Sequence, residues 1–169
     1  MNDVRSKKPL RIGEIPLAVP QKHRGDLILP IDAPFTTVLA HKLDWTKGPK
    51  GFFVQCPSDD TCVRCKPWSA RAQEYFLIPV FFPQCDEVGV LILNSELYGY
   101  DFGSTLKSSN AIQTQRVIKV QVVDQVGSTP FEVTSTTLEE VEIEIKLKAT
   151  LELFEARISK IGGLDKLFG

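Results

Sequence analysis

The chain has 169 residues, of which 43% are hydrophobic and 24% are charged, as in one soluble globular domain. This composition excludes a disordered chain, and the sequence contains no apolar run of about 18 residues, the length that a transmembrane helix needs. The formal net charge of −1 conceals an asymmetry: residues 1–72 carry 12 Lys and Arg against 7 Asp and Glu, and residues 73–169 carry 8 against 14. The basic first part is compatible with nucleic acid as a partner, and equally with an ordinary solvated surface.

The first 34 residues are rich in proline. Prolines at positions 9, 16, 20, 30 and 34 separate short apolar pieces and exclude a long helix. Basic residues stand at positions 5, 7 and 8, before the first apolar piece, and at position 11, within it. We expect residues 1–34 to form an extended basic arm with short edge strands. Because the chain starts on polar rather than apolar, secretory-type sequence, we also expect a cytoplasmic location.

Two strands are predicted next, at residues 35–41 and 52–55, where β-branched and aromatic residues dominate. A turn at residues 47–51, with two glycines and a proline, separates them. The first strand ends at His41, and the second runs directly into Cys56. An antiparallel pairing of the two would bring these residues together.

A cysteine cluster follows, with Cys56, Cys62 and Cys65 inside ten residues and His41 fifteen positions before the first. Three thiolates and one imidazole are a ligand set of closed, tetrahedral zinc sites, and the Cys62-x-x-Cys65 spacing lets both sulfurs face one ion. In a reducing compartment, clustered thiols are metal ligands more often than disulfides. We therefore expect one structural zinc, held on turns between strands.

The fourth zinc ligand has three candidates. We favour His41, because its strand would place it beside Cys56. Cys85 is the first alternative, since it lies in a predicted hairpin loop that could fold over the site, and His23 is the second.

The middle of the chain predicts two strand pairs. Residues 74–82 and 88–93 are continuous apolar runs joined by a hairpin loop, which indicates strands covered on both faces. A short helix or turn at 94–100, capped by Asn94 or Ser95, and a long loop at 101–115 follow. Residues 116–124 and 131–134 predict the second pair.

The C-terminal part has a mixed pattern. Residues 137–140 form a capping box, and acid-first Glu/Lys pairs four apart favour a helix from 138 to 161, whereas residues 141–148 alternate as in a strand. We favour the helix, ended by Gly162 and Gly163, with residues 164–169 as an amphipathic tip that packs back on the domain.

The order His41, Cys56, Cys62, Cys65, followed by an aromatic strand at 75–78 and a further strand at 88–93, resembles the zinc-containing single-stranded DNA-binding proteins of T4-type phages. The resemblance covers about residues 35–134. It implies a mainly β protein with a C-terminal helix (α+β), built as an OB-fold-like small barrel with an inserted zinc ribbon. The corresponding division of the chain is an arm at 1–34, a barrel at 35–136 with the ribbon around 41–66, and a helix and tip at 137–169.

The resemblance also implies binding of single-stranded DNA or RNA, with DNA favoured, in replication, recombination or a mobile element. Such binding needs cations along a groove and aromatic rings on which bases stack. Tyr75, Phe52 and Phe53 are expected in the core, and Tyr98 is a further candidate ring. The candidate interface residues are Lys42, Trp45, Lys47, Lys50, Arg64, Lys66, Trp68, Arg71 and Arg116.

An enzyme is not expected. The chain has only two histidines, no phosphate-binding loop and no nucleophile triad, and a fully ligated zinc leaves no position for a catalytic water. The alternative function is a zinc-ribbon structural subunit or adaptor in a larger assembly. The expected partners are single-stranded nucleic acid, replication or recombination proteins, and a second copy of the chain through the arm or the C-terminal helix, with no membrane.

Overall fold

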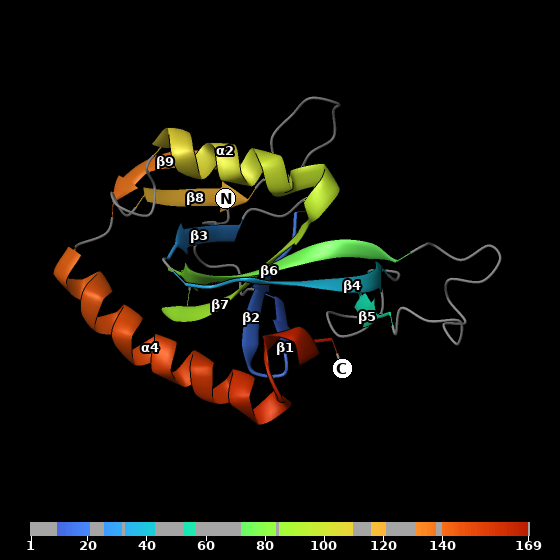
Figure 1. Cartoon of the computed structure of the whole chain (residues 1–169). Helices are drawn as coiled ribbons and strands as arrows, with labels where there is room; N and C mark the ends of the chain where they lie inside the picture. Colours follow the sequence, from blue (N-terminus) through green and yellow to red (C-terminus); the bar gives the residue numbers. More distant parts are fainter. Residues whose placement is uncertain are drawn as a thin grey trace.

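The computed structural model describes residues 10–20, 26–31, 33–42, 53–56, 72–83, 85–109, 116–120, 131–137 and 140–168. It is mainly β, with a curled, half-barrel sheet and a long C-terminal helix, as the sequence predicts (Figure 1). The strands are β1 (Leu10–Ile12), β2 (Ile15–Ala18), β3 (Asp26–Pro30), β4 (Thr36–Lys42), β5 (Phe53–Gln55), β6 (Gln73–Phe82), β7 (Glu87–Asn94), β8 (Arg116–Val120) and β9 (Phe131–Thr137). The helical elements are η3 (Ser95–Gly99), α2 (Tyr100–Ser109), α4 (Glu140–Ile161) and η4 (Leu164–Lys166).

The long strand β6 organises the sheet. One edge pairs with all of β7, from Tyr75 to Phe82, and the other edge is shared, first by β4 and then by β3. The strand order is β1-β2-β7-β6-β3-β8-β9, with β5 added to the free edge of β4. All described pairings are antiparallel except that of β2 with β7. The predicted hairpins β6–β7 and β8–β9 are confirmed.

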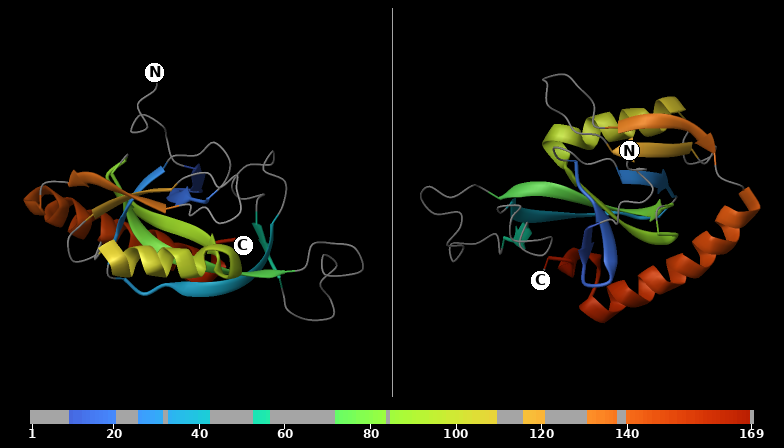
Figure 2. Two further views of the ribbon diagram at one scale, coloured as in Figure 1. Left: turned by 90° about the horizontal axis from the view of Figure 1, so that it is seen from above. Right: turned by 180° about the vertical axis from the view of Figure 1, so that it is seen from behind.

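The core has two layers, one on each face of the sheet. Along β7, Val88, Val90 and Ile92 belong to one layer, and Leu91 and Leu93 to the other. Helix α4 covers the first face, whereas α2 and the β8–β9 hairpin cover the second (Figures 1 and 2). Side chains alternate between the faces of a strand, so two covered faces require the continuous apolar runs seen in this sequence.

Residues 10–18 and 26–30 do not form an arm. They supply β1, β2 and β3 to the sheet, with Leu17, Ile28 and Leu29 almost completely buried. The prolines limit these strands to three to five residues, but burial of their apolar side chains still favours packing into the sheet over an extended arm. The expected basic start, residues 1–9, lies outside the described residues.

Helix α2 replaces the first part, residues 101–109, of the long loop expected at 101–115, and residues 110–115 lie outside the described residues. Phe102 and Leu106, one helical turn apart, pack on the second core layer, and the ring centroids of Phe102 and Phe131 are 4.9 Å apart. Serine and glycine lower the intrinsic helix propensity, so tertiary packing decides this segment. The preceding turn is capped as predicted: Asn94 Oδ1 accepts a hydrogen bond from the backbone N–H of Glu96 at 3.0 Å.

The C-terminal helix is confirmed over the strand alternative. Leu147, Leu151, Phe154 and Ile158, spaced by three and four, form its core-facing stripe. Gly162 and Gly163 end it with φ angles of 96° and 121°, and the N–H of Gly163 donates to the carbonyl of Ile158 at 3.0 Å. The tip packs back on the domain through Leu167 and Phe168, both buried.

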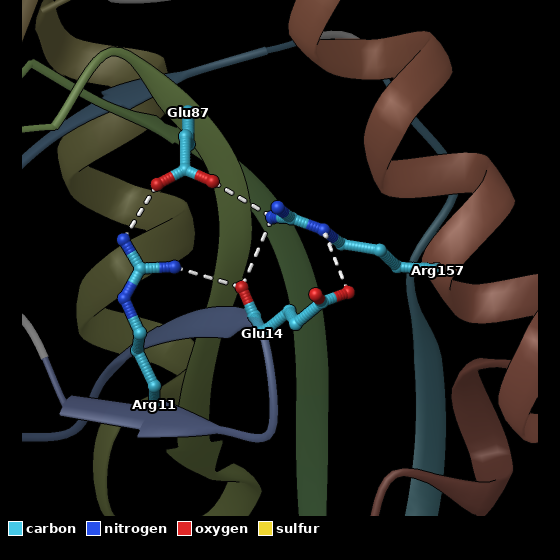
Figure 3. A network of polar contacts seen from close by, with 4 residues as sticks. All are labelled: Arg11, Glu14, Glu87 and Arg157. Carbon is cyan, nitrogen blue, oxygen red and sulfur yellow. Dashed lines mark hydrogen bonds and ion pairs between the residues drawn. The ribbon is translucent and has the colours of Figure 1, made fainter.

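Four charged residues fasten α4 to the sheet (Figure 3). Glu87, at the start of β7, accepts hydrogen bonds from Arg11 at 2.5 Å and from Arg157 at 2.7 Å. Both guanidinium groups also donate to the carbonyl of Glu14, in the β1–β2 turn. Burial by itself raises the pKa of Glu87, but the hydrogen bonds from the two arginines outweigh it and hold the pKa below its ordinary value. We call these residues the arginine clamp.

In the part of the chain that the structure describes, no helix is long and apolar enough to cross a membrane.

Candidate metal centre and nucleic-acid interface

The two described metal-ligand candidates, His41 and Cys56, lie on paired strands. His41 is opposite Val54 in the β4–β5 register, and the N–H of Cys56 donates to the carbonyl of Leu39 at 2.9 Å. Residues opposite each other, and residues two apart, share a face of the sheet, so His41 and Cys56 are diagonal neighbours on one face. Diagonal Cα atoms are about 7–8 Å apart, a separation that one ion can bridge between an imidazole and a thiolate.

The side chain of His41 is much more deeply buried than that of Leu39, its neighbour on the same face of β4. Leu39, two residues earlier on the same face, is 43% exposed, whereas His41 is only 2% exposed and Cys56 only 6%. A buried imidazole is normally oriented by a partner, and His41 does make a polar or electrostatic interaction.

The remaining two ligand candidates, Cys62 and Cys65, lie outside the described residues, in the connection 57–71. This connection leaves the described chain after Cys56 and rejoins it at Ala72. Gln55 and Gln73, the neighbours of these two residues, flank Ala40 on its two sides in one row of the sheet. Strands are about 4.8 Å apart, so Gln55 and Gln73 are roughly 10 Å from each other, and both ends of the connection lie close to the strand of His41. The described residues alone hold no cluster of three His, Cys, Asp or Glu.

Cys85 is excluded as the fourth ligand of an ion held by Cys56. The ten-residue strand β6 begins opposite Ala40, near His41, and ends at Phe82, beside the turn that carries Cys85. At about 3.3 Å per residue, these ends are roughly 30 Å apart. Burial and the neighbouring Glu87 carboxylate raise the pKa of the Cys85 thiol to about 11. His23, the other alternative, lies outside the described residues.

Most predicted nucleic-acid contacts fall outside the described residues. Lys42 ends β4 and Arg116 begins β8, so they lie on the sheet. Tyr75 is a core residue, 4% exposed, as expected, and its hydroxyl donates to Gln73. The residues outside are Trp45, Lys47, Lys50, Arg64, Lys66, Trp68 and Arg71.

The structure adds an exposed apolar row that the sequence did not single out. Phe35 is 56% exposed and Leu39 is 43% exposed. Phe35 immediately precedes β4 and Leu39 lies on it, at alternate positions that share the face of His41. The Phe35 ring packs edge to face on Phe76 of β6, with centroids 5.3 Å apart. We call Phe35, Leu39 and Phe76 the β4 row. The period-two spacing of Phe35, Leu39 and His41 was visible in the sequence, but the open side of this face was not.

Comparison of the chain with protein-family models, curated proteins and solved structures gives no match.

Proposed function

We propose that this protein binds single-stranded nucleic acid, DNA in preference to RNA, on a half-barrel stabilised by one structural zinc, in the service of replication, recombination or a mobile element. The observation that supports the proposal most is the β4 row, a partly exposed aromatic and aliphatic surface on the same face of the sheet as the buried His41. An aromatic ring that is more than half exposed, as Phe35 is, gives a base a surface on which to stack.

The β4 row suits bases better than phosphates. Phe35 offers a ring edge-packed on Phe76, and a stacked base contributes about 1–3 kcal/mol. Glu74, opposite Leu39 in the register, is exposed and would repel a phosphate, although its carboxylate can accept a hydrogen bond from an exocyclic amino group. We therefore propose that the phosphate backbone of the nucleic acid follows the lysines and arginines of residues 42–71, which come before and after β5 in the sequence.

The zinc would act at a distance from the bases. His41, Cys56, Cys62 and Cys65 would hold it, and its binding energy would fix the connection 57–71 against β4. Nothing in this role requires an open coordination position, in keeping with a binding protein rather than an enzyme.

Titration of fluorescent oligo(dT) and oligo(U) with zinc-loaded protein at several salt concentrations tests the proposal. Affinity should fall as salt rises from about 50 to 200 mM, because bound phosphates release counterions. Phe35→Ala should weaken binding about tenfold, whereas Leu153→Ala, which removes an apolar side chain of similar exposure on α4, should not. Absence of binding at the low salt concentration, or affinity indifferent to salt, would refute the proposal.

The competing function, an adaptor or structural subunit, has one observation in its favour. An apolar groove of about 460 Å³ lies between α4 and the start of the β3–β4 connection, with walls of Pro34, Pro79, Leu151 and Ile158. If the zinc-loaded protein fails to bind any oligonucleotide, this groove becomes the first surface to examine.

A further inference from the structure

The β4 row continues onto η3 through a contact between Gly99 and the ring of Phe76. A Cβ atom on residue 99 would lie 2.7 Å from Cε2 of Phe76, closer than such atoms come in proteins, so the backbone of Gly99 rests on the ring. Phe76 therefore touches two elements, because the exposed Phe35 ring packs against it as well. The residue that follows Gly99 is Tyr100, the first residue of α2.

Tyr100 has the most exposed large hydrophobic side chain in the part of the chain that the structure describes, at 85%. Its backbone is nevertheless held on both sides, by Gly99 on the Phe76 ring and by Phe102, which is buried in the second core layer. At 3.6 residues per turn, Tyr100 lies about 200° around the helix axis from Phe102, on the solvent side of α2. The start of α2 thus presents an aromatic ring to solvent from a well-packed backbone.

Tyr100 is close enough to the β4 row for one nucleic-acid strand to reach both. The Cα atom of Gly99 is about 4 Å from Cε2 of Phe76, and successive Cα atoms are about 3.8 Å apart, so the Cα atom of Tyr100 is within roughly 8 Å of this ring carbon. The ring centroids of Phe35 and Phe76 are 5.3 Å apart. Both exposed rings therefore fall within the roughly 4–16 nucleotides that one OB-fold domain covers.

The charges around Tyr100 favour a base over a phosphate as its ligand. Asp101 follows it in the chain, Glu96 is exposed on η3, and Glu74 is exposed two residues from Phe76 on the same face of β6. These carboxylates repel a phosphate, whereas the face of a base is uncharged and can stack on the ring. Stacking also releases no counterions, which distinguishes it from a phosphate contact.

We propose that Tyr100 is a second stacking platform, so that one nucleic-acid strand lies over the contact between Phe76 and Gly99 with one base on the Phe35 ring and another on the Tyr100 ring. This inference rests on the proposed function and deepens it, because it gives the bound strand a course. Phe35 precedes β4, β4 pairs with β6, and the η3–α2 junction rests on Phe76 of β6. The nucleic acid therefore crosses the strands of the sheet instead of running along them.

Titration of fluorescent oligo(dT) with zinc-loaded wild type and Tyr100 variants, at about 50 and 200 mM salt, tests the platform. Tyr100→Ala should weaken binding about tenfold at both salt concentrations and leave the salt dependence unchanged, because stacking releases no counterions. Tyr100→Phe keeps the ring and should bind like the wild type. Tyr100→Leu, the matched control, keeps an apolar side chain without an aromatic face and should bind as weakly as Tyr100→Ala. Circular dichroism of each variant checks that α2 stays folded.

A double variant tests whether the two rings hold different bases. Phe35→Ala/Tyr100→Ala should lose about a hundredfold in affinity, since the effects of independent contacts add as free energies. A double variant no weaker than either single variant would overturn the arrangement of two bases on two rings. If Phe35→Ala weakens binding and Tyr100→Ala does not, the platform is refuted and the proposed function stands. A wild type that binds no oligonucleotide at either salt concentration refutes both.

Discussion

Replacement of Glu87 by glutamine tests whether the arginine clamp holds α4 on the sheet. The Glu87 side chain is only 18% exposed and accepts hydrogen bonds from Arg11 and Arg157 at 2.5 and 2.7 Å. Hydrogen bonds to a charged group stabilise by about 1.5–3 kcal/mol each. Glutamine keeps one hydrogen-bond acceptor but loses the negative charge. Because Arg11 is 36% exposed, solvent screens the contribution of the Arg11–Glu87 ion pair to the free energy of unfolding. We therefore expect a loss of roughly 2–4 kcal/mol in the free energy of unfolding.

The assay is urea or thermal unfolding of the wild type and Glu87→Gln, with Glu152→Gln on the exposed side of α4 as the control. For a chain of this size, the expected decrease in Tm is about 5–15 °C. The folded pKa of Glu87 lies below that of the unfolded carboxyl, about 4.3, so its contribution is complete above about pH 5 and is lost as the pH falls through the folded value. The difference in the free energy of unfolding between the wild type and Glu87→Gln should therefore become smaller at acidic pH. A difference below about 0.5 kcal/mol at pH 7 would refute the reasoning.

Three further predictions concern the metal, the helix and the sheet. Cys56→Ser should lose bound zinc, and the wild-type Tm should drop on chelation, whereas Cys85→Ser should keep about one zinc per chain by elemental analysis; equal zinc loss in both variants would contradict the assignment. Phe154→Ala, which empties a core site under α4, should cost about 3–5 kcal/mol in chemical denaturation, against less than about 1 kcal/mol for the exposed Leu153→Ala. Gly89→Ala should displace β2, because the new methyl group would overlap the carbonyl of Pro16. The backbone amides within residues 15–18 should then exchange their hydrogens faster. Unchanged exchange would contradict this prediction and show that β2 accommodates the methyl group.

The local sequence pattern was sufficient to predict those elements whose structure depends little on contacts with distant segments. The continuous apolar runs at 74–82 and 88–93 predicted a covered hairpin, and β6 and β7 form it. The helix at Glu140–Ile161 was predicted from its i, i+4 pairs, and Gly162 with Gly163 ends it as expected. The capping box expected at 137–140 does not start the helix, because Thr137 is the last residue of β9. His41 and Cys56 were predicted at the ends of paired strands, and the β4–β5 register puts them on one face.

Other features depended on contacts between distant segments. Helix α2 is stabilised by the packing of Phe102 against Phe131. Helix propensity depends on the residues of the segment itself, so it does not reveal this contact. Residues 15–18 and 26–30 join the sheet because β2 pairs with β7 and β3 pairs with β6, although the prolines of this part of the chain suggested an arm.

The sequence by itself determined strands β4 to β9, the C-terminal helix and the candidate ligand pair, because hydrophobic period and turn chemistry act over a few residues. The tertiary structure alone decided which faces stay open. It left Phe35 and Leu39 uncovered on β4, placed Cys85 at the far end of β6, and brought Gly99, with Tyr100 after it, onto the ring of Phe76. Exposure and proximity are properties of the packed chain, so no stretch of sequence contains them.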